Sequence, residues 1–167
     1  MRTYLPSKPG KASLYFLLAY WIVTLFGIVL TIVMAAIYKP PSAEELGVPF
    51  SQAPAYLMTL PYHPLLNLTW IPFAWMYLVR YNGDNPLQEA IKLGAFWTVI
   101  CMLIDLVGWI IIPHPWAMTF REFYIDYQPW ITGIYLVIFA SPVAAYYLRQ
   151  AFSQQPRYQA HATGGNK

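Results

Sequence analysis

Four long runs of apolar residues constrain this chain more than any other feature of its sequence. The chain is 58% hydrophobic and only 10% charged over 167 residues, with a mean hydropathy of +0.42. Such a chain has too little polar surface to cover a water-soluble globule. A helix of roughly 20 residues spans a hydrocarbon core that is ~30 Å thick. The sequence therefore predicts an all-α polytopic membrane protein, built as a bundle of four transmembrane helices.

The four predicted helices form a single domain over residues 1–152. Their ranges are 14–38, 64–79, 91–112 and 130–148. Basic residues precede the first run, as in a signal peptide, but the run is much longer than the apolar part of such a peptide, which favours a retained anchor. The second run is the shortest and carries Pro72 in its middle, where we expect a kink. Residues 153–167 are predicted to be a mobile, polar cytoplasmic tail.

The positively charged residues predict how the bundle is oriented. Eight of the ten Lys and Arg residues fall in the N-terminal tail, in the connection between the second and third helices, and in the C-terminal tail. Cytoplasmic segments are enriched in Lys and Arg, so both termini should be cytoplasmic, and 39–63 and 113–129 should be outer loops of a plasma-membrane protein. The basic residues are scattered singly and form no stripe, which argues against nucleic acid as a partner.

Asp105 is the only formal charge inside the apolar run 93–112. A carboxylate that faces lipid is costly, so an acidic residue within a membrane helix indicates a functional site. Gly94, Thr98, Cys101 and Asp105 follow each other at steps of four and three, which places them on one face of small and polar residues. Asp105 should therefore point toward other helices. At a rise of ~1.5 Å per residue it lies about 12 Å below the outer end of its helix, in the outer half of the bilayer.

Other polar residues at a similar depth should complete a pocket around Asp105. The candidates for hydrogen bonds to its carboxyl group are Asn67, Thr31 and Tyr135, and the candidates at the outer boundary are His63 and His114. A second interpretation stays open, in which Asp105 is a neutral or water-solvated carboxyl group that only ties helices together.

The second outer loop carries a further polar cluster. Thr119 and Glu122 have the spacing of a capping box, which predicts a short interfacial helix over Met118–Tyr127. On that helix Glu122 and Asp126 share a face, with Arg121 beside them, and this cluster could hold a polar head group.

Metal and cofactor sites are not predicted. The histidines lack the local spacing of metal-binding motifs, and Cys101 is the only cysteine. The sequence contains no phosphate-binding loop, nucleophile elbow or dinucleotide fingerprint, so whether the chain is an enzyme is left undecided.

Three classes of function fit these features. The favoured class is a small-molecule or lipid-head-group binding, or accessory, membrane protein. The first alternative is a membrane-embedded enzyme that acts on a lipid or isoprenoid, with Asp105, His63, His114 or Glu122 as acid and base. The second is an oligomeric transporter or proton-coupled component that uses Asp105. The expected partners are the lipid bilayer, a lipid or small-molecule ligand, and further copies of the chain or a larger membrane complex.

Overall fold

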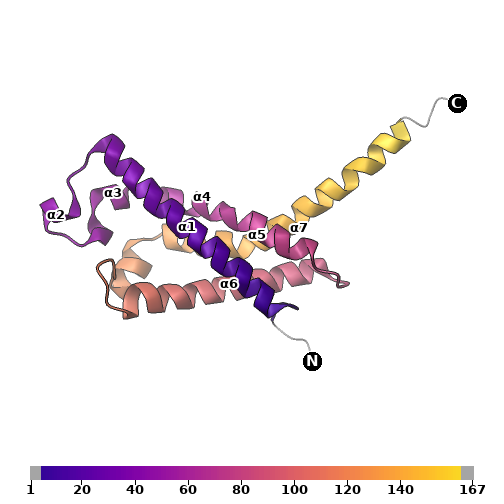
Figure 1. Cartoon of the computed structure of the whole chain (residues 1–167), viewed down its shortest axis with the longest axis horizontal. Coiled ribbons are helices and arrows are strands. Elements are labelled where there is room, and N and C mark those ends of the chain that lie inside the picture. The colour runs from indigo at the N-terminus through magenta and orange to yellow at the C-terminus, as the bar shows by residue number, and fades with distance from the viewer. Residues whose placement is uncertain (1–4, 163–167) are drawn as a thin grey trace.

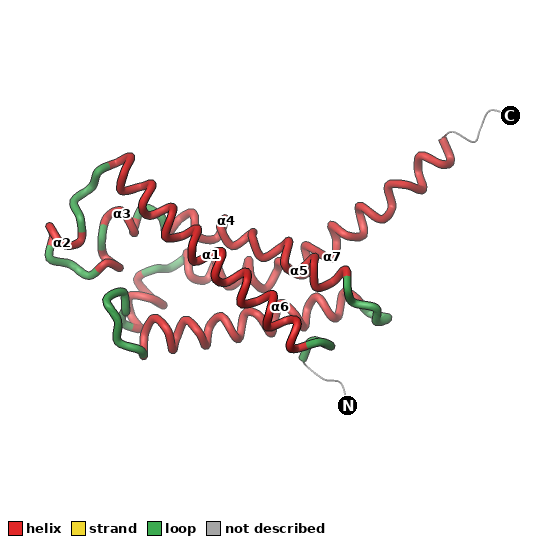
Figure 2. Tube along the Cα trace, in the orientation of Figure 1, coloured by secondary structure: helices red, strands yellow, loops and turns green. Residues whose placement is uncertain are grey.

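The computed structural model describes residues 5–162, with side chains as far as residue 153. Within this range the chain folds into helices that are joined by turns and loops, without strands (Figure 1, Figure 2). Successive long segments run in alternating directions along one axis. As a result, the start of the first helix and the end of the last helix lie at the same end of the molecule.

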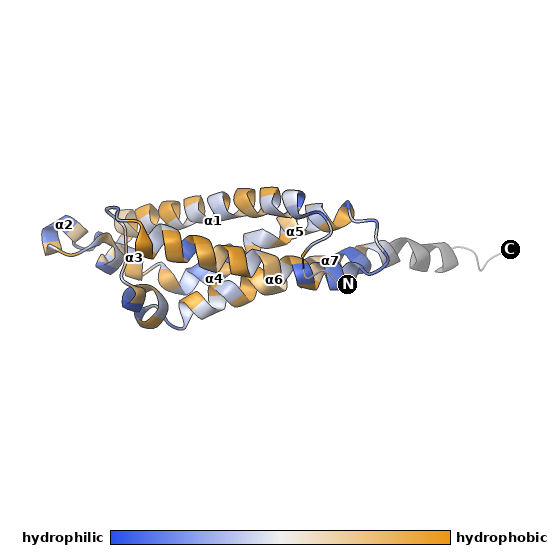
Figure 3. Cartoon of the chain, turned by 90° about the horizontal axis from the view of Figure 1, so that it is seen from below, coloured by the Kyte–Doolittle hydropathy of each residue, from blue (hydrophilic) through white to orange (hydrophobic). Residues whose placement is uncertain are grey.

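Three helices are long and apolar enough to cross a membrane. They are α1 (Pro9–Tyr38), α6 (Pro86–Asp105), which continues through the π-helical segment η4 (Leu106–Ile111), and α7 (Trp130–Ala162). Apolar residues cover much of the long helices, and hydrophilic residues gather at both ends of the bundle (Figure 3). The all-helical architecture and the membrane-length helices were both predicted from the apolar runs.

The segment between α1 and α6 is helical but irregular. It consists of the 3-10 turn η2 (Leu60–Tyr62), the helix α4 (His63–Leu66), the 3-10 turn η3 (Asn67–Thr69) and the helix α5 (Trp70–Val79). A kink was expected at Pro72, but the irregular turn η3 lies just before α5. Pro72 itself lies in the first turn of α5, where its missing N–H needs no partner. That this segment forms a fourth crossing stays a prediction.

The helix boundaries differ from the predicted ones mainly at polar ends. α1 begins at Pro9, before the predicted residue 14, and α6 begins at Pro86, before the predicted residue 91. Both starts are set by a proline in the first turn, and at α6 the Asn85 side chain also accepts a hydrogen bond from the Gln88 N–H. α7 continues past residue 148 to Ala162, and residues 163–167 of the predicted tail lie outside the described range.

The connections at the far end of the bundle contain short helical turns. The connection after α1 holds α2 (Ala43–Leu46), η1 (Phe50–Gln52) and α3 (Pro54–Leu57). The connection after η4 holds the π-helical turn η5 (Glu122–Asp126). The two connections contact each other, and they are joined by a hydrogen bond from Tyr127 Oη to the carbonyl of Ser51 (2.5 Å).

The buried core lies where α1, α5, α6 and α7 cross. Phe16, Trp70 and Trp97 are almost completely buried there, and Trp97 Nε1 donates a hydrogen bond to the carbonyl of Ala12 (2.9 Å). Gly94 of α6 lies directly against α7, because a Cβ atom at this position would be 2.3 Å from the carbonyl oxygen of Phe139. The second half of α1, by contrast, is mostly exposed.

Glu89, on the first turn of α6, is a buried carboxylate that fastens the start of the chain to the bundle. Its Oε1 accepts hydrogen bonds from the Ser7 N–H (2.7 Å), the Ser7 hydroxyl (2.7 Å) and the Tyr77 hydroxyl (2.6 Å). Glu89 is 3% exposed and Tyr77 is also buried, so removing Glu89 would leave the Tyr77 hydroxyl without this acceptor and free Ser7 from the bundle.

We therefore expect Glu89→Ala to destabilise the fold by about 1–3 kcal/mol, the cost of leaving buried hydrogen-bonding groups unsatisfied. The measurement is the midpoint of thermal unfolding of the purified protein in detergent. Glu44→Ala is the matched control, because Glu44 is exposed on α2. Equal midpoints for the two variants would contradict the role assigned to Glu89.

Candidate functional site

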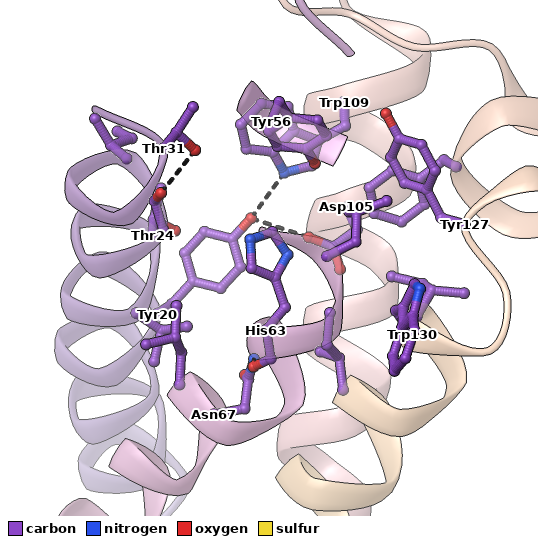
Figure 4. Close-up of a pocket in the computed structure, with 18 of the residues that line it drawn as sticks. Tyr20, Thr24, Thr31, Tyr56, His63, Asn67, Asp105, Trp109, Tyr127 and Trp130 are labelled. Carbon is purple, nitrogen blue, oxygen red and sulfur yellow. Dashed lines mark hydrogen bonds between the residues drawn. The ribbon is translucent and has the colours of Figure 1, made fainter. Parts of the chain in front are cut away.

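A cavity of about 500 Å³ lies between α1 and the far end of the bundle. Its walls come from the middle of α1, from α4 and η3, from the last turns of α6 with η4, and from the first turns of α7 (Figure 4). Residues of the two connections, including Phe50 and Trp116, also line it. We refer to it as the Asp105 cavity.

Asp105 is the polar centre of this cavity. Its Oδ1 accepts a hydrogen bond from the Tyr20 hydroxyl of α1 (3.0 Å), and its Oδ2 accepts one from the Tyr135 hydroxyl of α7 (2.9 Å). The Cys101 thiol, one turn earlier on α6, donates a longer bond to Oδ2 (3.5 Å). The residue is 6% exposed and still lines the cavity, so a buried carboxyl group connects three helices at the edge of an open space.

Tyr20 is held in place by a second hydrogen bond. Trp109 Nε1, on η4, donates to the Tyr20 hydroxyl oxygen (3.2 Å), and this hydroxyl donates in turn to Asp105 (Figure 4). An indole N–H can only donate, so the direction of the Trp109–Tyr20 bond is fixed, and the Tyr20 hydroxyl keeps its own proton for Asp105. Tyr20 was missed in the sequence, although Tyr20, Thr24, Gly27 and Thr31 are spaced by four, three and four residues. That spacing places them on one face of α1, and all four line the cavity.

His63 lies at the start of α4 and also lines the cavity (Figure 4). The Thr59 hydroxyl donates its single proton to the carbonyl of Tyr56 (2.6 Å), and Thr59 Oγ1 lies 3.3 Å from His63 Nε2. We therefore assign the ring proton to Nε2, which donates to Thr59, and this leaves Nδ1 as an acceptor. With one ring nitrogen donating and the other accepting, this assignment describes a neutral imidazole.

Asn67 lines the cavity but does not contact Asp105. Its amide donates to the carbonyl of His63 (2.8 Å), and its carbonyl oxygen accepts from Trp70 Nε1 (2.8 Å). Thr31, the other expected partner of Asp105, donates to the carbonyl of Gly27 instead (3.0 Å). Both side chains are occupied by neighbours one turn away, an arrangement that helix depth alone does not predict.

The remaining predicted residues lie away from the cavity wall. His114 forms a local turn, in which Nε2 lies 2.8 Å from the Gly108 carbonyl and Nδ1 accepts from the Trp116 N–H (3.1 Å). Arg121 and Asp126 form an exposed ion pair with a separation of 3.6 Å. None of these three residues is among those that line the Asp105 cavity in the described part of the chain.

Glu122 links the two connections. Its Oε2 accepts from the Thr119 N–H (2.7 Å) and hydroxyl (2.8 Å), Thr119 Oγ1 accepts from the Glu122 N–H (3.2 Å), and Oε1 accepts from the Gln52 amide (2.7 Å). The Thr119 N–H and the Gln52 amide hold the pKa of Glu122 below its usual value. The cluster of acids in this connection is therefore occupied by structural bonds, and Glu122 is not part of the cavity wall.

The chemistry of the cavity is that of one carboxyl group, one neutral imidazole and several hydroxyl groups in an aromatic and aliphatic enclosure. Among the side chains described, residues 5–153, no group of three His, Cys, Asp or Glu residues is placed to share a metal ion. No protein family, characterised protein or solved structure matches this chain. The function is therefore argued from the geometry of the cavity.

Proposed function

We propose that this chain is a plasma-membrane protein that crosses the bilayer four times, with both termini in the cytoplasm. We also propose that it binds a small molecule or lipid head group in the Asp105 cavity. The observation that carries the binding proposal is the cavity itself, which is about 500 Å³ in volume and is shared by Asp105 and His63. Ligand pockets in proteins are typically of this size, largely apolar, and provided with a few polar groups that orient the ligand.

The four crossings rest on two observations. Three helices are of membrane length, and the segment η2 to α5 runs beside them as an additional pass of the chain. Its irregular turn at Asn67–Thr69 is packed against α7 and α1, and non-helical backbone is tolerated at membrane depth where protein buries it. With four passes, the distribution of Lys and Arg supports cytoplasmic termini and a cavity in the outer half of the bilayer.

Binding is favoured over catalysis by the way the polar groups are arranged. Both oxygens of Asp105 already accept hydrogen bonds from side chains, and His63 donates to Thr59, so neither group is paired with the other as an acid and base. An enzyme acting on a lipid or isoprenoid would need such a pair beside the substrate. A proton-coupled transporter would need Asp105 to titrate during transport, within an assembly of several copies or partner proteins.

A ligand that copurifies with the protein is the first test. We expect native mass spectrometry of the purified chain to show a non-covalent adduct, and Gly27→Leu to lose it. Gly27 lines the cavity, and a Cβ atom there would lie 3.8 Å from His63 Nε2, so a leucine side chain would fill the space. Ala35→Leu is the control, because Ala35 is exposed on the same helix. An adduct that survives in Gly27→Leu, or a wild-type protein without any adduct, would overturn the proposal.

The orientation can be tested by labelling. Ser42→Cys lies in the connection after α1, and Asn82→Cys lies in the turn between α5 and α6; both positions are exposed. A membrane-impermeant maleimide should label Ser42→Cys in right-side-out vesicles and Asn82→Cys in inside-out vesicles. The wild-type protein is the control, since its free Cys101 is buried. The opposite pattern would invert the proposed topology, and labelling of both positions from one side would remove the pass between them.

A further inference from the structure

The Asp105 cavity contains a carboxylate without a positively charged partner. No Lys or Arg side chain is among the described residues that line it. The ring proton of His63 is assigned to Nε2, which leaves Nδ1 unprotonated and the imidazole uncharged. A buried charge in proteins is normally paired, and here the pairing charge does not come from the wall.

The hydrogen bonds around Asp105 suit the ionised form of its carboxyl group. The Tyr20 hydroxyl, which accepts from Trp109, donates to Oδ1, while the Tyr135 hydroxyl and the Cys101 thiol donate to Oδ2. Burial favours the neutral form of a carboxyl group, and a positive charge beside it favours the ionised form that these donors stabilise.

One position on this carboxylate is still free. An ionised carboxylate offers about four lone-pair sites, two on each oxygen. Oδ2 accepts two hydrogen bonds and Oδ1 accepts one. A ligand that reaches Oδ1 with an N–H group would complete the set.

Aromatic side chains surround this position. Tyr20, Tyr56, Trp109, Tyr127 and Trp130 lie around Asp105 and His63 in the cavity (Figure 4). The faces of tyrosine and tryptophan rings attract cations, most strongly where water is excluded. The rest of the wall is aliphatic, with Ile28, Leu60 and Ile134 among its members, and it suits an uncharged hydrocarbon body.

We propose that the ligand of the Asp105 cavity is a protonated amine on an apolar body, whose N–H donates to Asp105 Oδ1 and whose positive charge lies among the aromatic rings. This inference rests on the proposed function and specifies the chemical class of its ligand. Complementary charge is the reason for the assignment: a neutral or anionic head group would leave the carboxylate unpaired or repelled.

The test compares an amine with a neutral molecule of the same shape. Adamantan-1-ylmethylamine and adamantan-1-ylmethanol share one compact hydrocarbon body and differ in charge. We expect wild-type protein in uncharged detergent to bind the amine at least about tenfold more tightly than the alcohol, as measured by calorimetry. Dodecylamine and dodecanol form a second pair, and the pair with the larger preference shows whether the natural body is compact or a lipid chain.

Two variants locate the preference. Asp105→Asn should reduce the ratio of amine to alcohol affinity to about one, whereas Asp84→Asn, an exposed carboxylate in the turn before α6, should keep the wild-type ratio. Gly27→Leu should abolish binding of both probes while Ala35→Leu retains it. Gly27→Leu leaves the carboxylate intact, so the cavity is tested even if Asp105→Asn does not fold.

The possible results separate this inference from the proposed function. Equal binding of amine and alcohol that is lost in Gly27→Leu would overturn the amine assignment and leave a binding cavity. A preference for the amine that persists in Asp105→Asn would also overturn the assignment. Absence of binding by any of the four probes to the wild-type protein would overturn it as well, and a lack of any copurified adduct would separately overturn the binding function.

Discussion

The hydrogen-bonded carboxyl group of Asp105 is the interaction on which the arrangement of the long helices depends. It receives one hydroxyl proton from α1 and one from α7, and it is itself carried by α6. In an apolar surrounding, each of these groups would be costly to leave unpaired, so the three helices are fixed relative to one another by more than shape. The contact at Gly94 brings α7 close enough to α6 for Tyr135 to take part. The same carboxyl group thus holds the bundle together and forms the polar point of the cavity.

The two connections beyond the helices both contribute to the cavity wall, and they bind each other. Gln52 donates to Glu122, Tyr127 donates to the Ser51 carbonyl, and the Phe50 and Trp116 rings pack with centroids 6.2 Å apart. Of the residues that looked in sequence like a head-group site, Glu122 is engaged in this contact, whereas Arg121 and Asp126 form an exposed ion pair with each other.

The sequence predicts the helices well because a long apolar run admits few other structures. The depth of a residue along its helix predicts its hydrogen-bond partners less well. Helices tilt, and polar side chains often bond to groups one turn away on the same helix. Tyr135 was expected near Asp105 and lies there, whereas Asn67 bonds to His63 and Trp70. A contact between Tyr20 and Asp105 was not predicted. Tyr20 is recognised as part of the polar face of α1 only when the spacing of Thr24, Gly27 and Thr31 is continued toward the start of the helix. The connection after α1 and the connection after η4 contact each other although they are far apart in the sequence. Neither periodicity nor motif spacing can indicate such a contact.

A comparison of the two buried acids shows why burial alone does not identify a site. Glu89 and Asp105 are both on α6, are 3% and 6% exposed, and accept three hydrogen bonds each. The donors to Glu89 fasten the start of the chain to the bundle, and Glu89 is not among the residues that line the Asp105 cavity. Asp105, in contrast, borders this cavity and has one oxygen that accepts a single bond. The two buried acids therefore differ in the space beside the carboxyl group, and only at Asp105 does this space include the cavity.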